Sequence, residues 1–218
     1  MDKILSNVLV RKTLQVAVDR FCKEQISKIR EEAIPVTAVS FPRLYKIFSQ
    51  CCGSLQMDVP HEVYVTGKLS GINALSIGTD KEPIILISRK AIVSLSDEEL
   101  KFMIGHELGH VLQKNLMCHT IKGMMDALSD YSEVLGTAIT DLIGVPLNQW
   151  YRCSEYTSDR AGFICCRGDM RAVRSLFAKL SSDSRGEDPY MNFVELDMAH
   201  PLYGHRIKEL ETYKFNCQ

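Results

Sequence analysis

The sequence predicts an α+β fold that is mainly helical and contains one small three-stranded sheet of mixed or antiparallel strands. Two observations predict it. Long segments repeat apolar residues every three or four positions, as one face of a helix does. Between them lie three short segments rich in β-branched residues, separated by glycines and a polar turn. The 218 residues, 45% of them apolar, suffice for a substantial core. We expect a single domain over 1–218, made of an N-terminal helix (1–34) and a core (35–218).

The first half of the chain predicts two helices and then the strands. Residues 1–30 have apolar positions at helical spacing, with basic residues between them. Core packing is favoured for this helix, while an amphipathic segment that rests on a membrane or covers a cleft stays open. Pro42 is expected to begin the second helix, because proline suits the first helical turn. The three strands are expected at Glu62–Thr66, Ile72–Gly78 and Pro83–Ser88.

A well-marked helix follows the strands. Ser96 and Glu99 have the spacing of a capping box, in which each side chain bonds the other residue's backbone amide. The apolar residues after Ser96 give one face for a core. Gly105 and Gly109 each weaken a helix interior by up to about 1 kcal/mol relative to alanine. We therefore expect another backbone or a substrate to approach them closely, with tight packing as the alternative.

The rest of the chain is predicted to be helical apart from one loop. Residues 115–143 are expected to form a helix, and Pro146 is expected to open another that Gly168 closes. Ser181–Asn192 is rich in Ser, Gly, Asp and Pro and predicts a loop. Two further helices are expected, around Met170–Leu180 and Leu202–Tyr213.

The segment from His106 to His110 has the pattern His-Glu-x-x-His. Two imidazoles four residues apart on a helix, with Glu107 between them, form a zinc site that can activate water. Catalytic zinc usually takes three protein ligands, so one ligand must come from elsewhere. Glu155 is the best candidate, and Asp159, four residues later, can accept the second N–H of a bound imidazole. From spacing alone, a solvated salt-bridging face explains Glu155 and Asp159 equally well.

Three motifs occur in order along the chain: His106 to His110, Glu155 to Asp159, and a His-Pro-x-x-x-x-Arg segment from His200 to Arg206. In these motifs the chain resembles the gluzincin zinc metallopeptidases of the HtpX-like and CAAX prenyl endopeptidase family, as a soluble member. The resemblance implies a zincin-like fold with an active-site helix. It also implies one Zn²⁺ per chain, held by His106, His110 and Glu155, with Glu107 as general base and then general acid.

The same resemblance assigns further residues. His200 would face the site and help to hold the substrate or the oxyanion, as a second catalytic residue; without the resemblance it would be an ordinary surface histidine. Arg206 and Asp159 would lie behind the metal ligands. The segment that contains Asn73 and Ala74 resembles the family's Asn-Ala-aromatic strand. These two residues would belong to an edge strand that binds an extended peptide as an added strand.

The function expected from these features is a zinc endopeptidase that cleaves extended or unfolded polypeptides. The alternative is a latent or non-enzymatic zinc-binding module, whose cleft is blocked by the N-terminal helix or by Ser181–Asn192. Glu107 argues against a module that only binds, because binding needs no general base. Hydrolysis of a non-peptide amide by the same chemistry also stays open.

Composition argues against other partners. The net charge of −1 gives no reason to expect nucleic acid. The longest apolar segment, Val134–Leu147, is shorter than the roughly 20 residues of a membrane helix, so we expect no integral membrane segment; peripheral contact stays open. The eight cysteines show no C-x-x-C spacing, and the start shows no apolar signal region. Reduced thiols and a cytoplasmic location are therefore expected.

Overall fold

The computed structural model describes residues 23, 26–58, 62–114, 116, 145–183 and 202–216. The helix predicted over 115–143 lies almost wholly outside this part of the chain. The elements are, in order, β1 (Ile34–Pro35), α3 (Pro42–Ser54), β2 (Glu62–Thr66), β3 (Ala74–Gly78), β4 (Pro83–Ser88), α4 (Arg89–Ser94), α5 (Asp97–Leu112), α8 (Val145–Cys165), α9 (Met170–Asp183) and α10 (Tyr203–Asn216). None of the helices in the described ranges is long and apolar enough to cross a bilayer.

The sheet has the strand order β1-β2-β4-β3. β2 runs parallel to β4, whereas β3 is antiparallel to β4 and β1 is antiparallel to β2. The predicted mainly helical α+β fold with a small mixed sheet is confirmed. The sheet has four strands where three were expected, because β1 is a two-residue, exposed strand that ends in proline and so has no alternating pattern. The strand expected from Ile72 begins two residues later, at Ala74.

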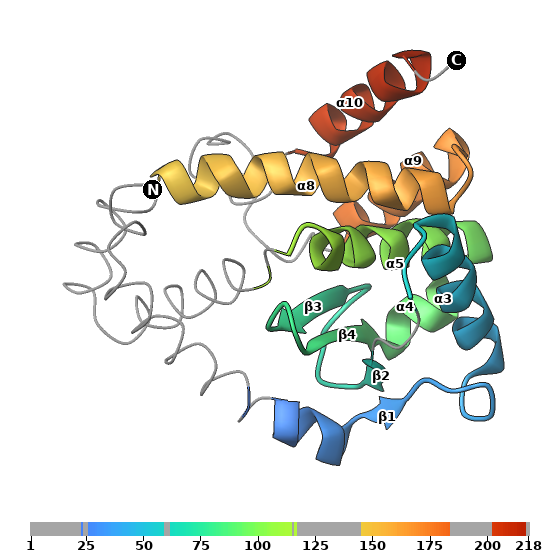
Figure 1. Ribbon diagram of the computed structural model, residues 1–218. Coiled ribbons are helices and arrows are strands. Elements are labelled where there is room, and N and C mark those ends of the chain that lie inside the picture. The colour runs from blue at the N-terminus through green and yellow to red at the C-terminus, as the bar shows by residue number, and fades with distance from the viewer. Residues whose placement is uncertain are drawn as a thin grey trace, which may run out of the picture.

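The sheet buries both of its faces. Successive side chains of a strand point to opposite faces, and in β4 Ile85 and Ile87 join the main core, which includes residues of α3 and α5. Ile84 and Leu86 join a second cluster with Ile26, which belongs to a helical stretch over 26–32. In Figure 1 α5 lies on one side of the sheet and this stretch on the other. The described end of the N-terminal helix thus packs on the core; residues 1–22 lie outside the described ranges.

The predicted start of α5 is confirmed. The Ser96 side chain accepts a hydrogen bond from the Glu99 amide, and the Glu99 carboxylate accepts one from the Ser96 amide. Lys179 of α9 also donates to that carboxylate, at 2.7 Å. The first three residues of the expected loop are helical, because α9 continues to Asp183. Asp183 accepts a hydrogen bond from the Ile72 amide, which ties the end of α9 to the segment before β3; residues 184–192 lie outside the described part.

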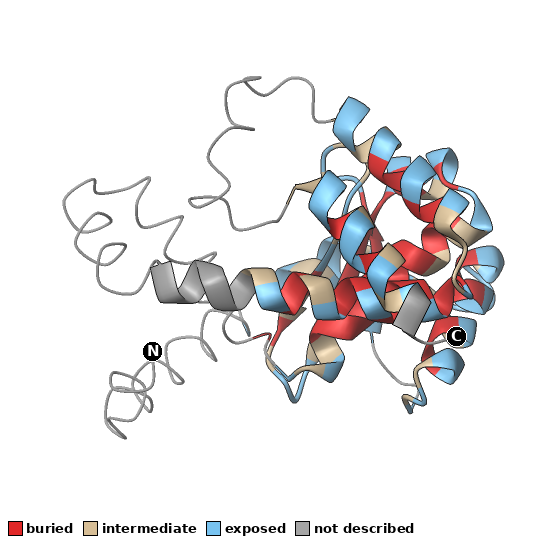
Figure 2. Cartoon of the chain, turned by 90° about the horizontal axis from the view of Figure 1, so that it is seen from above, coloured by how far each residue is buried: buried red, intermediate tan, exposed pale blue. Residues whose placement is uncertain are grey.

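α5 and α8 cross at very short range. A Cβ atom added to Gly105 would lie 2.9 Å from the Gly162 Cα, and one added to Gly109 would lie 2.7 Å from the Ser158 Cα. The expected close approach of another backbone to these glycines is therefore confirmed, and the backbone is that of α8. Figure 2 shows that buried residues gather where the helices face one another, while exposed residues occupy their outer faces. Small residues at this crossing bring side chains of both helices into one site.

Gly162→Ala tests the crossing. A Cβ at this position would lie 2.5 Å from the Phe102 carbonyl oxygen, and a backbone atom can move away only if the helices separate. We expect a loss of about 1–3 kcal/mol in the free energy of unfolding, as for other overpacked sites. Urea denaturation measures it. Gly53→Ala in α3 is the matched control, because nothing lies within 4 Å of its Cβ position. An equal loss in both variants would contradict the close crossing.

Candidate metal centre

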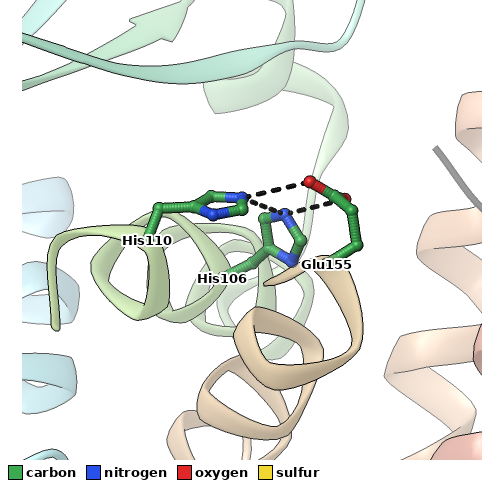
Figure 3. Close-up of side chains that lie close together, drawn as sticks. All are labelled: His106, His110 and Glu155. Atoms are coloured by element: carbon green, nitrogen blue, oxygen red, sulfur yellow. Dashed lines mark hydrogen bonds and ion pairs between the residues drawn. The ribbon is translucent and has the colours of Figure 1, made fainter. Parts of the chain in front are cut away.

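Three side chains that the sequence singled out converge between α5 and α8. His106 and His110 lie one turn apart on α5, and Glu155 reaches them from α8; Figure 3 shows the three pointing toward one another. Their ligand atoms all lie within 4.8 Å of one another. The Nε2 atoms of His106 and His110 are 3.1 Å apart. The Glu155 Oε2 lies 3.5 Å from the His106 Nε2, and the Glu155 Oε1 lies 3.3 Å from the His110 Nε2.

This donor set suits a transition-metal ion. Imidazole nitrogens together with a carboxylate oxygen are ligands that such ions accept, and an ion among them would bond to all three residues. The Glu155 side chain is only 1% exposed. A carboxylate taken this far out of water needs a cation or charged donors near it. The residues present therefore fit a metal ion.

Asp159 and Arg206 lie behind His106. The Asp159 Oδ1 is 2.9 Å from the His106 Nδ1. Arg206 comes from α10 and donates to both Asp159 oxygens, from Nε to Oδ2 at 2.7 Å and from Nη2 to Oδ1. Its guanidinium also lies over the Phe177 ring, 4.8 Å from the centroid. With Asp159 as acceptor, the His106 Nδ1 carries the hydrogen, which leaves the Nε2 lone pair for an ion.

His106, Asp159 and Arg206 stabilise one another's charged forms. Burial acts to raise the pKa of Asp159, but Arg206 and the hydrogen bonds hold that pKa below its usual value, so the carboxylate stays ionised. Burial acts to lower the pKa of His106, yet Glu155 and Asp159 raise it overall in the metal-free site. The pKa of Arg206 is raised because Asp159 and Glu155 outweigh its burial. The carboxylates of Glu155 and Asp159 carry two negative charges, and the guanidinium of Arg206 balances only one of them. The remaining negative charge favours a cation.

Glu107 is buried beside the histidines, on the side of the sheet. Ser76, on β3, donates a hydrogen bond from its hydroxyl to the Glu107 Oε2 at 2.7 Å. Both residues are less than a tenth exposed. Ser76 was not among the site residues predicted from the sequence. Its signal was a hydroxyl at the centre of an otherwise apolar strand segment, Ala-Leu-Ser-Ile-Gly.

β3 is an edge strand among the described strands, because it pairs only with β4 in the sheet order. The Asn73 carbonyl accepts a hydrogen bond from the Ser88 amide, and the Asn73 amide donates to the Ser88 hydroxyl. In an antiparallel pair, hydrogen-bonded and non-hydrogen-bonded residues alternate. The main chains of Ala74 and Ser76 therefore face away from β4, toward the edge of β3 that pairs with no strand among those described, called the open edge below.

The other ring nitrogen of His110 meets a second pair of α8 side chains. The His110 Nδ1 lies 3.0 Å from the Ser158 hydroxyl and 3.3 Å from the Ser154 hydroxyl. Gln113, at the end of α5, contacts the Ser158 hydroxyl at 2.9 Å. None of these three residues was predicted from the sequence to belong to the site. The signal for the two serines was that each of the two acids, Glu155 and Asp159, directly follows one of them, whereas no local pattern marked Gln113.

His200 lies outside the described residues, so its expected place at the site stays a prediction. Arg206, from the same motif, does reach the site, although it is 47 residues from Asp159 in sequence. The neighbouring His205 is exposed on α10.

The chain is similar to known peptidases. The model of the peptidase family M48 matches residues 39–214. A "Protease HtpX homolog" of Ralstonia nicotianae is 22% identical over 203 residues, covering 80% of this chain and 70% of the relative. The homologue of Ralstonia pickettii is 23% identical with the same coverage. The "Plastoglobule-localized metallopeptidase 48, chloroplastic" of Arabidopsis thaliana is 28% identical over 101 residues, covering 46% of this chain and 29% of the relative.

Proposed function

The chain belongs to peptidase family M48, and on that premise we propose that it is a zinc-dependent endopeptidase acting on extended or unfolded polypeptides. Membership indicates a metallopeptidase. One observation carries the proposal of zinc-dependent cleavage of extended polypeptides. Two imidazoles and a buried carboxylate converge, and Glu107 and the open edge of β3 lie beside them.

We assign one Zn²⁺ per chain to His106, His110 and Glu155. Two histidines and a glutamate are a ligand set of catalytic zinc, which leaves a position for water or substrate. Bound there, zinc would supply Lewis-acid chemistry that lowers the pKa of water to about 7 and polarises a carbonyl. Asp159, supported by Arg206, would hold His106 in the tautomer that binding requires.

Glu107 is the proposed general base. Its carboxylate takes a proton from the attacking water and then passes it to the leaving amine, so that a peptide bond is replaced by a carboxylate and an amine. Ser76 holds one carboxylate oxygen in place, which orients the group. His200 would stabilise the negative charge that develops on the carbonyl oxygen; this role rests on the resemblance of its motif alone.

The open edge of β3 is the proposed substrate site. An extended peptide can add to a sheet edge through main-chain hydrogen bonds, and the main chains of Ala74 and Ser76 face that edge. Asn73 precedes them at the start of the strand. Because Ser76 also contacts Glu107, a peptide bound here would pass close to the base. Main-chain binding favours unfolded or extended polypeptides over folded ones.

Cleavage of an unfolded protein tests the proposed endopeptidase. The full chain, loaded with zinc, is incubated with that protein, and the products are identified by mass spectrometry. Internal cuts that disappear when a chelator removes the metal would support an endopeptidase, whereas trimming from the ends only would contradict it. A chain that binds zinc and cuts nothing would favour the latent or non-enzymatic zinc-binding module. Removal of residues 1–22 then separates these two, because only a latent enzyme gains activity.

His110→Ala tests the metal ligands. We expect the wild-type chain to retain about one zinc per chain through dialysis and the variant to lose it, because two protein ligands do not make the usual three of a catalytic site. Atomic emission of the dialysed proteins measures the content. His205→Ala, on the exposed part of α10, is the matched control and should keep its zinc. Retention of zinc by His110→Ala would place the metal elsewhere.

A further inference from the structure

α8 presents two parallel rows of polar side chains to α5. Glu155 and Asp159, four residues apart, form the row at the metal centre. Ser154 and Ser158 directly precede them and form a second row, which meets the Nδ1 of His110. Both serines are buried, with exposures of 3% and 0%. The side of His110 that faces away from the metal is therefore met by hydroxyl groups.

Gln113 shows how the hydroxyl of Ser158 is used. One side-chain atom of Gln113 lies 3.1 Å from the Gly109 carbonyl oxygen, 3.3 Å from the Ser154 carbonyl oxygen and 2.9 Å from the Ser158 Oγ. Carbonyl oxygens only accept hydrogen bonds, so this atom is the amide nitrogen. Its two hydrogens serve these three acceptors, and the Ser158 Oγ is the nearest of them. A hydroxyl oxygen has two acceptor sites. Ser158 can therefore accept one hydrogen bond from Gln113 and another from the Nδ1–H of His110.

We propose that Ser158, held by Gln113, is the positioning residue that keeps the hydrogen of His110 on Nδ1 and its Nε2 lone pair directed at the metal. An imidazole that binds an ion through Nε2 must carry its hydrogen on Nδ1, and an acceptor at that atom fixes both the tautomer and the ring rotation. This inference rests on the proposed function only in taking His110 as a zinc ligand.

The two histidines are held by different chemistry. His106 has an ionised carboxylate with a guanidinium behind it, whereas His110 has a neutral hydroxyl with an amide behind it. His110 is itself 4% exposed, so bulk water has little access to replace a lost hydroxyl. Ser154 is the longer contact, at 3.3 Å against 3.0 Å. Ser158 is therefore the residue to change.

The test is the zinc affinity of the full chain, measured by competition with a chelator of known affinity. Ser158→Ala removes one oxygen and keeps the Cβ that packs against Gly109. We expect it to weaken zinc binding about 10- to 100-fold, the usual effect of losing a hydrogen-bond partner of a metal ligand. Thr157→Ala is the matched control. It removes the hydroxyl of the next residue, which is exposed and bonds only along its own helix among the contacts described, to the Cys153 carbonyl; its affinity should not change.

Two further measurements separate positioning from a general structural role. If Gln113 acts through Ser158, Gln113→Met will weaken zinc binding in the wild type but add nothing to Ser158→Ala. In the zinc-loaded protein with ¹⁵N-labelled histidine, the Nδ1–H signal of His110 should be protected from exchange in the wild type and lose that protection in Ser158→Ala. The melting temperature of the metal-free proteins reports any loss of folding on its own.

Equal zinc affinities of Ser158→Ala and Thr157→Ala would overturn this inference and leave the proposed function intact. Additive effects of the Gln113 and Ser158 changes would overturn the part assigned to Gln113. A wild-type chain that binds no zinc would instead contradict the proposed function itself.

Discussion

Glu107→Gln is expected to leave zinc bound and to lower the cleavage rate about 100- to 10,000-fold, the usual contribution of a general base. An amide has nearly the shape of a carboxylate but cannot take a proton from water. Its oxygen can still accept the hydrogen bond from Ser76, so the buried surroundings of the side chain should persist. The measurements are kcat with an unfolded or fluorogenic peptide substrate and the zinc content of the same samples.

Glu98→Gln is the control for this change. Glu98 lies on the same helix, is partly exposed and pairs with Lys101 at 2.6 Å, well away from the histidines in sequence. The same chemical replacement there should leave kcat unchanged. If Glu107→Gln kept most of the wild-type rate with zinc bound, another group would have to be the base.

Arg206→Met is expected to lower the free energy of unfolding by about 3–5 kcal/mol, the usual cost of breaking a buried ion pair. Methionine fills part of the space beside Phe177 but leaves the ionised Asp159 without its guanidinium. Such a loss is large against the roughly 5–15 kcal/mol that stabilises a typical domain. Urea denaturation of the metal-free and zinc-loaded chains measures it.

The loss should also depend on pH. In the wild type the pKa of Asp159 is lowered, so its stabilising effect is present above the unfolded value of about 3.9 and is lost as the pH falls through the folded pKa. In Arg206→Met the buried Asp159 carboxylate has no guanidinium to stabilise its negative charge, and protonation removes that charge. The difference in stability between the two proteins should therefore be largest near neutral pH and shrink in acid.

Arg174→Met is the matched control for the ion pair. Arg174 pairs with Glu211 on the surface, with its side chain 61% exposed, and exposed pairs contribute about 0–1 kcal/mol. The same replacement should thus cost little and show no such dependence on pH. Equal losses in both variants would mean that the buried pair of Arg206 and Asp159 stabilises the fold no more than an exposed pair does.

Much of the local structure was predictable from the sequence, because it depends on neighbours in the chain. The capping box of Ser96 and Glu99, the start of α3 at Pro42 and the strands β2 and β4 involve residues a few positions apart. The pair of histidines on one helix face follows from helical periodicity alone. β1 was missed because a two-residue strand has no period, and α9 runs past its expected end because Asp183 gains partners near β3, which no local pattern reveals.

Only the tertiary structure decided what stands behind the metal centre. From spacing alone, a solvated surface explained Glu155 and Asp159 as well as a metal site did. The family resemblance, rather than the residues themselves, favoured the metal site. Burial against α5 brings both acids to the histidines, because Gly105 and Gly109 allow α8 to approach so closely. Ser76, Ser158 and Gln113 are ordinary polar residues in sequence. Each gains its partner across a contact between separate elements, and such contacts depend on how the helices and the sheet pack, which no short segment of this chain specifies.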